Sequence, residues 1–558
     1  MPVYAGMIVA VPAELLSSPL KNGRDLGEPD VSALVVGGTG KIRTGGATVF
    51  LKVVAVTGAV VRRDGQVQAE GRPYDHATLG PLEDWLDAQA GPGVIDTIAG
   101  RAVLDKKHVN GKYRRLLTAA FMIRALVLWT LMPEAQLSDV ITALAGDLAL
   151  LPWSKAWHPA SERACLDWRK ALGPAPLAGL QDAVLAAAAG EHAERGGQSL
   201  TIGKSRPLTA SSADGSLLRV PDTPRNRAEF GSVGTAGDSA AWPCVRLFPL
   251  TNCYTRSLLA MPWGPAGSDK TASEQRLLDA AMKDFPRVLS KDRVWLLDRL
   301  WHGVPRLKAL AQLTHWAVRL KSDITLKRIS EIYPDHSYLA EVSGDGVTMT
   351  VRVIEYWVDI EGQEVKEMFC LITSLLDWEE YPGPELAALY KWRWDGSETA
   401  LREAKAPLHG AGPGTGAMLR SGSPELIAQE IAAWACSTEM TRGVTRDAAL
   451  AAAPARKGRR AGQPVRYRDL SLTRARRLIL AAIRAGSRGC MALTGKIAEY
   501  RTVTDRNRHR KRKSKSPSTF GHAGPEDRTT RIAPAIITMA NNPPRPAGTP
   551  ETRLTETH

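Results

Sequence analysis

Apolar side chains change their spacing near residue 200. In residues 76–200 they recur at helical intervals, as in AFMIRALVLWTLM, and the stretch SDVITALAGDL begins at a suitable N-cap, Ser138. From residue 201 short runs bounded by Gly, Pro and Asn appear, and helical and extended stretches then alternate as far as residue 440. This succession is typical of a mixed α/β sheet. We therefore expect an α-helical N-terminal domain at 76–200 followed by an α/β core at 201–440.

Strict alternation of apolar and polar positions appears once inside this core. The stretch HSYLAEVSGDGVTMTVRVIEYWVDIEGQE has period two, with turn signals at GDG and EGQE. We predict an antiparallel β insertion at about 323–380. A helix over 384–408 follows, and a further helix begins with Ser423 as N-cap and Pro424 in its first turn.

The two ends of the chain have different patterns. Residues 1–75 are rich in Gly and Val, and we assign them no role: they are either a small β element or a poorly ordered leader. Residues 441–516 are basic and contain one basic helix, in DLSLTRARRLILAAIRAG. The tail at 517–558 is rich in Pro, Thr and Asn, and we expect it to be disordered.

Charge is concentrated in one region. The chain has a formal net charge of +15, yet from Arg442 to Lys515 there are 22 basic residues against four acids. The remainder is therefore nearly neutral. Nucleic-acid phosphates are the commonest partner of such a region, although a merely solubilising tail is an alternative. The densest run, Arg510, Lys511, Arg512 and Lys513, is the candidate contact.

Cysteine usage and hydropathy bear on location. The six cysteines form no CxxC motif and no zinc-type pairing with His, which indicates reduced thiols in the cytosol. The most apolar stretch is interrupted by Arg124, and no uncharged apolar run reaches 18 residues. We expect a cytoplasmic protein with no membrane partner.

Three carboxylates stand out by their positions. Asp214 precedes a glycine and an apolar run, Asp298 closes the apolar stretch VWLLD, and Glu398 lies on the later helix. Mg²⁺ or Mn²⁺ takes oxygen ligands, and two such ions can promote phosphodiester cleavage. Spacing along the chain does not show whether the fold brings the three acids together. Glu398 also shares a helix face with Arg402 and Lys405, so an ordinary salt-bridged face is an alternative explanation.

The stretch YKWRWDGSETALREAK closely resembles the Tyr–Arg–Glu–Lys signature of DDE transposases of the insertion-sequence-4 family. Tyr390, Arg393, Glu398 and Lys405 match its four residues. ADGSLLRVPDTPRN and LLDRLWHG resemble the segments of the family's first and second aspartates, and LRSGSPELIAQEI resembles its post-signature segment. The resemblance runs in the family's order from about residue 110 to 440.

The resemblance implies a ribonuclease-H-like core with a β-stranded insertion. It implies that Asp214, Asp298 and Glu398 hold Mg²⁺ or Mn²⁺, and that the chain cleaves DNA and transfers strands at the ends of an insertion sequence. Tyr390, Arg393 and Lys405 would contact DNA phosphates, with Arg402 beside them.

The partners implied are double-stranded DNA, as terminal inverted repeats and target, and a second copy of the chain in a synaptic complex. The N-terminal helical domain would recognise sequence, and the protein would be associated with the bacterial nucleoid when bound. A DNA-binding protein that has lost catalysis and a nuclease on the same fold are the alternatives.

The chain departs from the signature at one place. The family has three residues between Arg and Glu, whereas four separate Arg393 from Glu398 here. On a regular α-helix, positions four apart lie about 40° from each other and positions five apart about 140°. Either a π-bulge near Gly396 absorbs the extra residue, or the helix restarts with Asp395 and Glu398 forming a capping box. We expect the bulge, because the spacing from Glu398 to Lys405 is that of the family.

Overall fold

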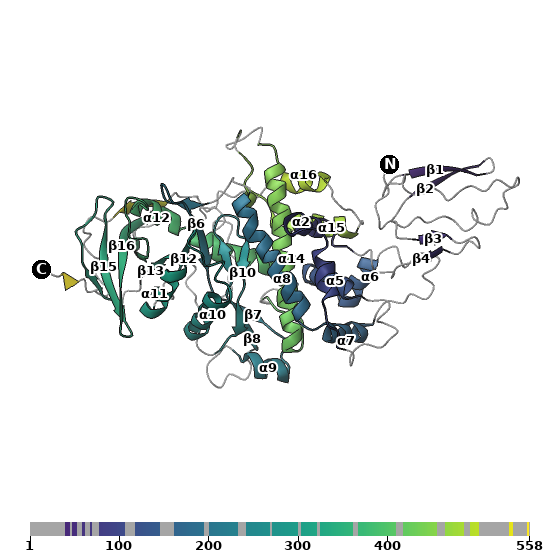
Figure 1. The fold of residues 1–558 in the computed structure, drawn as a ribbon, viewed down its shortest axis with the longest axis horizontal. Coiled ribbons are helices and arrows are strands. Elements are labelled where there is room, and N and C mark those ends of the chain that lie inside the picture. The colour runs from purple at the N-terminus through teal and green to yellow at the C-terminus, as the bar shows by residue number, and fades with distance from the viewer. Residues whose placement is uncertain are drawn as a thin grey trace, which may run out of the picture.

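The computed structural model describes most of the chain between residues 78 and 500 and a few short segments outside it. The described residues are 39–44, 47–52, 59–61, 67–69, 78–105, 118–145, 161–194, 200–232, 242–267, 270–298, 303–320, 324–360, 367–408, 417–454, 462, 464–484, 491–500, 535–539 and 555–556. They form a mixed α/β structure, in which a large mixed sheet lies on one side and a group of helices on the other (Figure 1).

The segment at 76–200 is helical, as predicted. Its helices are α2 (Pro81–Ala90), α3 (Val94–Gly100), α5 (Ala119–Leu131), α6 (Leu137–Ala145), α7 (Glu162–Leu172) and α8 (Ala175–Glu194). Helix α5 is apolar nearly all round, and it is buried on all sides, as such a helix must be. Its one charge, Arg124, is paired with Glu83 on α2 and with Asp96 on α3.

The predicted N-cap of α6 is wrong. The helix begins at Leu137, so Ser138 lies inside it. The side chain of Asp139 accepts the backbone N–H of Gln136 at 3.0 Å, and thereby satisfies a donor at the start of the helix. The sequence offers two polar residues next to each other here, and Asp139 supplies the cap.

The large sheet is mixed in direction. Strand β6 (Leu208–Ala213) pairs with β9 (Leu250–Asn252) in antiparallel and with β12 (Arg293–Leu297) in parallel orientation. Beyond β9 lies the antiparallel β10 (Leu258–Ala260), and beyond β12 the parallel β13 (His315–Arg319). Short β5 (Thr201–Ile202) also pairs with β6. Helices α10 (Lys270–Asp284) and α11 (Val304–Leu313) precede and follow β12, as the sequence pattern predicts.

A smaller sheet lies beside the large one. It consists of β7 (Ser216–Arg219), β8 (Cys244–Leu247) and β11 (Trp263–Pro265), all antiparallel, and α9 (Pro224–Phe230) follows β7. Side chains of β7 and β8 share a buried cluster with the end of the helix at 400–405 and with the helix that begins at Pro424.

The predicted β insertion is antiparallel, as expected, and continues the large sheet past β13. Its strands are β14 (Leu326–Arg328), β15 (Ser337–Gly344), β16 (Val347–Ile360) and β17 (Glu367–Thr373). Asp345 and Gly346 both have positive φ in the turn between β15 and β16, so the GDG signal marked a real hairpin turn.

The chain ends contribute short strands. Strands β1 (Thr39–Thr44) and β2 (Ala47–Lys52) form one hairpin, and β3 (Ala59–Val61) and β4 (Val67–Ala69) another, which agrees with the small β element that was one alternative for 1–75. Within the tail that we expected to be disordered, β18 (Ala535–Met539) pairs with β16 and β19 (Thr555–Glu556) with β14. β18 is the apolar, partly β-branched run AIITM, a composition that favours strand.

The second half of the chain is helical after β17. Its elements are α12 (Gly383–Tyr390), the π-helix η5 (Asp395–Thr399), α13 (Ala400–Lys405), the 3₁₀-helix η6 (Ala406–Leu408), α14 (Pro424–Ala451), the 3₁₀-helix η7 (Tyr467–Asp469), α15 (Leu472–Arg484) and α16 (Met491–Glu499). Helix α14 begins at Pro424 with Ser423 extended before it, as predicted, and it continues through residue 440, the expected boundary.

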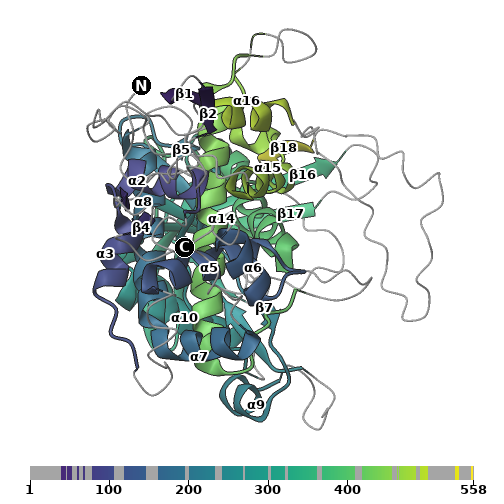
Figure 2. The same ribbon diagram turned by 90° about the vertical axis from the view of Figure 1, so that its right-hand side faces the viewer.

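Helix α14 contacts both sides of the molecule. Figure 2 shows it in green along the length of the helical side. Toward the N-terminal helices, Ser437 shares a hydrogen bond of 2.7 Å with Thr130, and Gly443 lies so close to Trp85 that a Cβ there would be 2.1 Å from the indole. Toward the sheet, Glu439 accepts the backbone N–H of Leu258 at 2.8 Å.

The helical core takes in part of the basic region. One buried cluster contains apolar side chains of α2, α3, α5 to α8 and α14 together with Tyr467, Ile479 and Ile497. None of the helices within the described ranges is long and apolar enough to cross a membrane. The five cysteines that the structure describes are free thiols.

Candidate active site

The two predicted aspartates lie at the ends of neighbouring parallel strands. Asp214 follows the last residue of β6 and Asp298 follows the last residue of β12. The register pairs Ser212 with Leu296, so the two strands end level with each other. Parallel strands place their carboxyl ends at one edge of the sheet, where ligand sites of α/β proteins are found. Both carboxylates are accessible, with 20% and 30% of their side-chain surface exposed.

The turn after Asp214 rests on a buried ion pair that the sequence analysis missed. Arg246 on β8 and Glu274 on α10 are both buried, and their side chains are 3.0 Å apart. A Cβ at Gly215 would lie 2.1 Å from a carboxylate oxygen of Glu274. A larger residue after Asp214 would therefore have to displace the Glu274 carboxylate from its position beside Arg246.

The predicted π-bulge is confirmed. The backbone N–H of Ala400 donates to the carbonyl of Asp395, the i→i−5 bond of a π-helix. The alternative, a helix that restarts at Asp395, is wrong, because the preceding Trp394 has helical dihedrals and no capping bond is made there. A π-turn takes up one extra residue, so residues five apart across it lie about as four apart do on an α-helix.

The π-turn packs directly on the sheet. The hydroxyl of Thr251 on β9 donates to the carbonyl of Gly396 and thereby satisfies a backbone acceptor within the π-turn. A Cβ at Gly396 would lie 2.3 Å from the hydroxyl of Ser212 and 3.0 Å from the Cα of Cys253. Only glycine lets the helix come this close to β6, and so to the end of the strand that carries Asp214.

Arg393 reaches the aspartates in spite of the extra residue. Its guanidinium nitrogens are 3.7 Å from Asp214 and 3.8 Å from Asp298, and the group lies 4.6 Å from the centre of the Trp394 ring. The side chain is 5% exposed, and its Nε and Nη1 have no hydrogen-bond partner among the described residues. A buried cation with free donors at this place is a receptor for negative charge.

Glu398 is exposed, and the other charges of the site shift the pKa of its carboxyl. Partial burial of the carboxyl and the charge of Asp214 raise the pKa of Glu398 above its ordinary value, and Asp298 adds to the rise. Arg393 and Arg402 oppose it. The contributions of Asp214 and Asp298 to this rise indicate that both aspartates lie near the Glu398 carboxyl.

The three acids have the right chemistry for a hard cation but do not form a closed ligand set. Carboxylate oxygens are the ligands that Mg²⁺ and Mn²⁺ take in proteins. In the part of the chain that the structure describes, however, no three His, Cys, Asp or Glu side chains are near enough to hold one ion together. The guanidinium of Arg393 lies between the two aspartates instead.

Tyr390 and Lys405 tie the helical segment to the two strand ends. The buried hydroxyl of Tyr390 donates to the carbonyl of Leu297, next to Asp298, at 2.8 Å, and burial raises its pKa to about 12. The ammonium of Lys405 donates to Ser216 and, at 2.8 Å, to the carbonyl of Leu217, close behind Asp214. Burial lowers the pKa of Lys405 to about 8.

The remaining predicted contacts are at the surface or outside the described residues. Arg402 is exposed and makes one long hydrogen bond, 3.4 Å, to Thr399. Arg510, Lys511, Arg512 and Lys513 lie outside the described residues. Another basic residue, Arg468 of η7, stacks 4.2 Å from the Trp392 ring, so part of the basic region lies against the segment 390–405.

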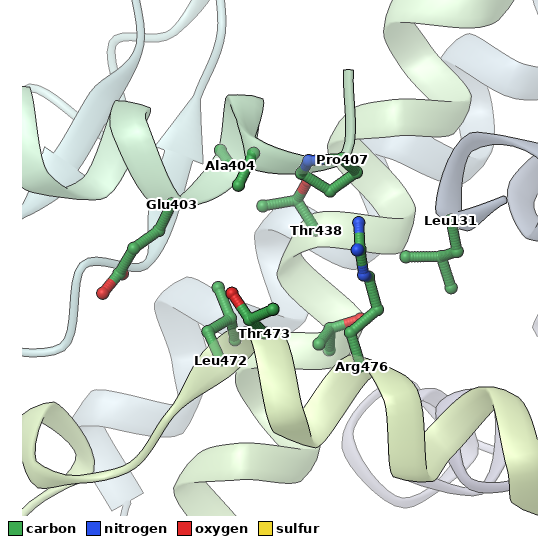
Figure 3. Close-up of a pocket in the computed structure, with 10 residues that line it drawn as sticks. Leu131, Glu403, Ala404, Pro407, Thr438, Leu472, Thr473 and Arg476 are labelled. Atoms are coloured by element: carbon green, nitrogen blue, oxygen red, sulfur yellow. The ribbon is translucent and has the colours of Figure 1, made fainter. Parts of the chain in front are cut away.

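A small cavity lies behind this segment, between α13, α14 and α15. Figure 3 shows Arg476 extending from α15 into the space, with Glu403 on the other side. The lining residues are Leu131, Glu403, Ala404, Ala406, Pro407, Thr438, Thr441, Leu472, Thr473 and Arg476. None of the three acids lines it.

No family model matches the chain. It is 26% identical over 236 residues to the Escherichia coli (strain K12) protein "Transposase InsG for insertion sequence element IS4", which covers 40% of this chain. The chain spans 49% of that relative's length. A solved structure, "piggyBac transposase synaptic complex with hairpin DNA", covers 76% of this chain and 81% of its own, with a TM-score of 0.36 and 11% identity. A likeness at that level does not establish a shared fold.

Proposed function

We propose that the chain is a DDE transposase that cleaves DNA at the ends of an insertion sequence and transfers the cut strand. The observation that carries the proposal is the meeting of Asp214, Asp298 and Arg393 at one sheet edge, with Glu398 electrostatically coupled to both aspartates. The partial identity to a curated transposase supports it.

The sheet supports the ribonuclease-H-like core that the family resemblance implies. The antiparallel strands β10, β9 and β6 continue into the parallel pair β12 and β13, and the antiparallel insertion stands between Asp298 and Glu398 along the chain. The acids are thus carried by adjacent strands and by a helix that follows the insertion.

The metal would be Mg²⁺ or Mn²⁺, held by Asp214, Asp298 and Glu398. When bound, such an ion makes a water or hydroxyl more nucleophilic and stabilises the leaving oxygen of a phosphodiester. Arg393 has to move from between the aspartates if a cation is to bind both. Its buried donors, of which Nε and Nη1 make no hydrogen bond among the described residues, then suit a phosphate oxygen of the DNA.

The side chains around the acids divide the remaining work. Tyr390 fixes the end of β12 through its bond to the Leu297 carbonyl, and Lys405 fixes the segment after Asp214. Both are thereby held beside the acids, where Lys405 and the exposed Arg402 present positive charge to a DNA backbone. The basic region at 441–516 adds sequence-independent phosphate contacts, and the N-terminal helices recognise the inverted repeats.

We propose further that two copies act together in a synaptic complex on double-stranded DNA. The proposal places the protein in the cytoplasm, at the nucleoid when bound, and gives it no membrane partner.

Strand cleavage on a linear duplex that carries the element's own end tests this function. Wild type would be assayed with Mg²⁺ beside Asp214→Ala, Asp298→Ala and Glu398→Ala, and DNA binding would be measured in parallel. Asp222→Ala is the matched control, because this exposed aspartate only pairs with Arg227 on α9. We expect cleavage to be lost in the three variants and kept in the control.

The other outcomes separate the alternatives. Wild type that binds the duplex but never cuts it, with either metal, identifies a DNA-binding protein without catalysis. Wild type that cuts but never joins the end to a target duplex identifies a nuclease.

A further inference from the structure

An arginine outside the family signature contacts the π-turn from the sheet. Arg256 lies in the turn between β9 and β10, with φ of 58°, a left-handed conformation that side chains other than glycine seldom adopt. Its backbone N–H donates to the carbonyl of Asn252 at 2.9 Å, and the Asn252 side chain accepts the N–H groups of Tyr254 and Thr255. Because a strained backbone persists only where the surrounding structure holds it, this conformation suggests a function for the Arg256 side chain.

The side chain points at the first residue of the π-turn and at the helix that follows the π-turn. One terminal nitrogen of Arg256 is 2.7 Å from Asp395, the first residue of η5, and the other is 2.7 Å from Glu403 on α13. The arginine side chain is 9% exposed. Burial alone would lower the pKa of Arg256, but Glu403 and Asp395 raise it above the ordinary value, so the group stays charged.

The π-turn brings the two acids that Arg256 contacts closer to one side of the helical segment. Asp395 and Glu403 are eight positions apart, which is about 80° round a regular α-helix. With one residue absorbed by the π-turn they lie as residues seven apart do, about 20° from each other. The double ion pair therefore favours the π-turn over a regular helix.

We propose that Arg256 is a positioning residue, which holds the π-turn through Asp395 and Glu403 and so aims Glu398 at the two aspartates. We call Arg256 with Asp395 and Glu403 the brace. Asp395 is one of the four residues between Arg393 and Glu398, where the family has three, so the brace holds the part of the helix that contains the extra residue. The role rests on the proposed function only in that Glu398 is taken to be catalytic.

Amide hydrogen exchange tests the brace without metal, DNA or activity. Full-length wild type would be compared with Arg256→Met, which keeps the length of the side chain and removes its charge. Arg227→Met is the matched control, since Arg227 makes a comparable double contact with Asp222 at an exposed site. In Arg256→Met both acids lose their cation, and we expect the amides of residues 395–405 to exchange about tenfold faster than in wild type. The expected change is no larger, because the two acids are about a quarter to a third exposed and water can solvate them. Unchanged exchange there overturns the proposal.

Cleavage kinetics then test what the brace does for the site. We expect Arg256→Met to lower kcat and to raise the Mg²⁺ concentration needed for half-maximal cleavage, while DNA affinity stays within twofold. Arg256→Lys should fall between wild type and Arg256→Met, because one ammonium cannot pair with both acids at once. Equal loss of DNA affinity and kcat would contradict a positioning role.

Two further variants keep the test decisive if Arg256→Met does not fold. Asp395→Asn and Glu403→Gln each remove one half of the brace and leave the buried arginine one partner. Faster exchange of 395–405 in both supports the proposal, and none in either overturns it. If wild type fails to cut DNA, the proposed function falls, whereas the exchange result still decides whether Arg256 holds the turn.

Discussion

The site is assembled in two different ways. Asp214 and Asp298 are placed by strand register, since β6 and β12 pair in parallel and end level with each other. Glu398 is placed by a helical segment whose π-turn is held by contacts from elsewhere, among them Thr251 and Arg256. The end of a strand is held by backbone hydrogen bonds to the strands on both sides. A π-turn is a rare departure from the regular helix, and here side chains from other elements hold it.

Because of this difference, substitutions in the two parts of the site should have different effects. At the strand ends, a substitution of the acid changes chemistry and leaves geometry alone. On the helical segment, substitutions of residues that never touch substrate change geometry. Variants of the first kind should therefore lose activity while the fold is kept, and variants of the second kind should lose activity because the local structure changes.

Asp298→Asn is expected to have the largest effect on activity and little effect on folding. Under the proposed function Asp298 would bind the metal, and loss of that carboxylate would remove several kcal/mol of transition-state stabilisation, so cleavage should fall by roughly 10³-fold. The strand ladder does not depend on this carboxylate, and the thermal midpoint should stay near that of wild type. A large fall in the midpoint would contradict placement by register.

Gly396→Ala should disturb structure first and activity as a result. The added Cβ meets Ser212 and Cys253 at distances that force the π-turn away from the sheet. We expect a loss of about 1–3 kcal/mol in the free energy of unfolding, measured by urea denaturation. Gly190→Ala on α8, where a Cβ meets nothing within 4 Å, is the control and should be neutral or stabilising.

Lys405 gives a pH dependence with a defined sign. Its pKa is about 8 in the folded protein, against an ordinary 10.5, so between these values the unfolded chain binds more protons. The free energy of unfolding of wild type should therefore rise with pH from about 8 to 10.5 relative to Lys405→Met. The replacement of the exposed Lys283 by Met is the control for the removal of a positive charge. A fall in that window would refute the assignment.

The smallest expected effect is on the titration of Glu398. Because Asp214 raises the pKa of Glu398, Asp214→Asn should lower it toward the ordinary value. Carboxyl carbon chemical shifts of labelled Glu398, followed with pH, would measure the change. An unchanged pKa would mean that the two carboxyls do not share a volume.

The sequence predicted the parts of this site that are local along the chain. An apolar run indicated the strand that ends at Asp298, whereas at Asp214 it indicated only the strand that follows. The extra residue in the family signature, together with the family spacing from Glu398 to Lys405, favoured the π-turn near Gly396. Arg256, Thr251, Arg246 and Glu274 were not found. Each acts on a residue far away in sequence, and a long-range pair leaves no periodic pattern. Of the two acids that Arg256 contacts, Asp395 was considered only as a possible capping residue, and Glu403 was not singled out.

The long helix α14 has a consequence for how the protein loses its structure. The indole N–H of Trp434 donates to the Ala404 carbonyl at 2.9 Å, and the guanidinium of Arg442 donates to the Ala400 carbonyl at 2.7 Å. Through these two hydrogen bonds α14 contacts the segment 390–405. The same helix contacts Trp85 and Thr130 on the N-terminal side. Melting of either side removes the packing surface of the other, so calorimetry should record one cooperative transition across the helices and the sheet, with equal calorimetric and van't Hoff enthalpies.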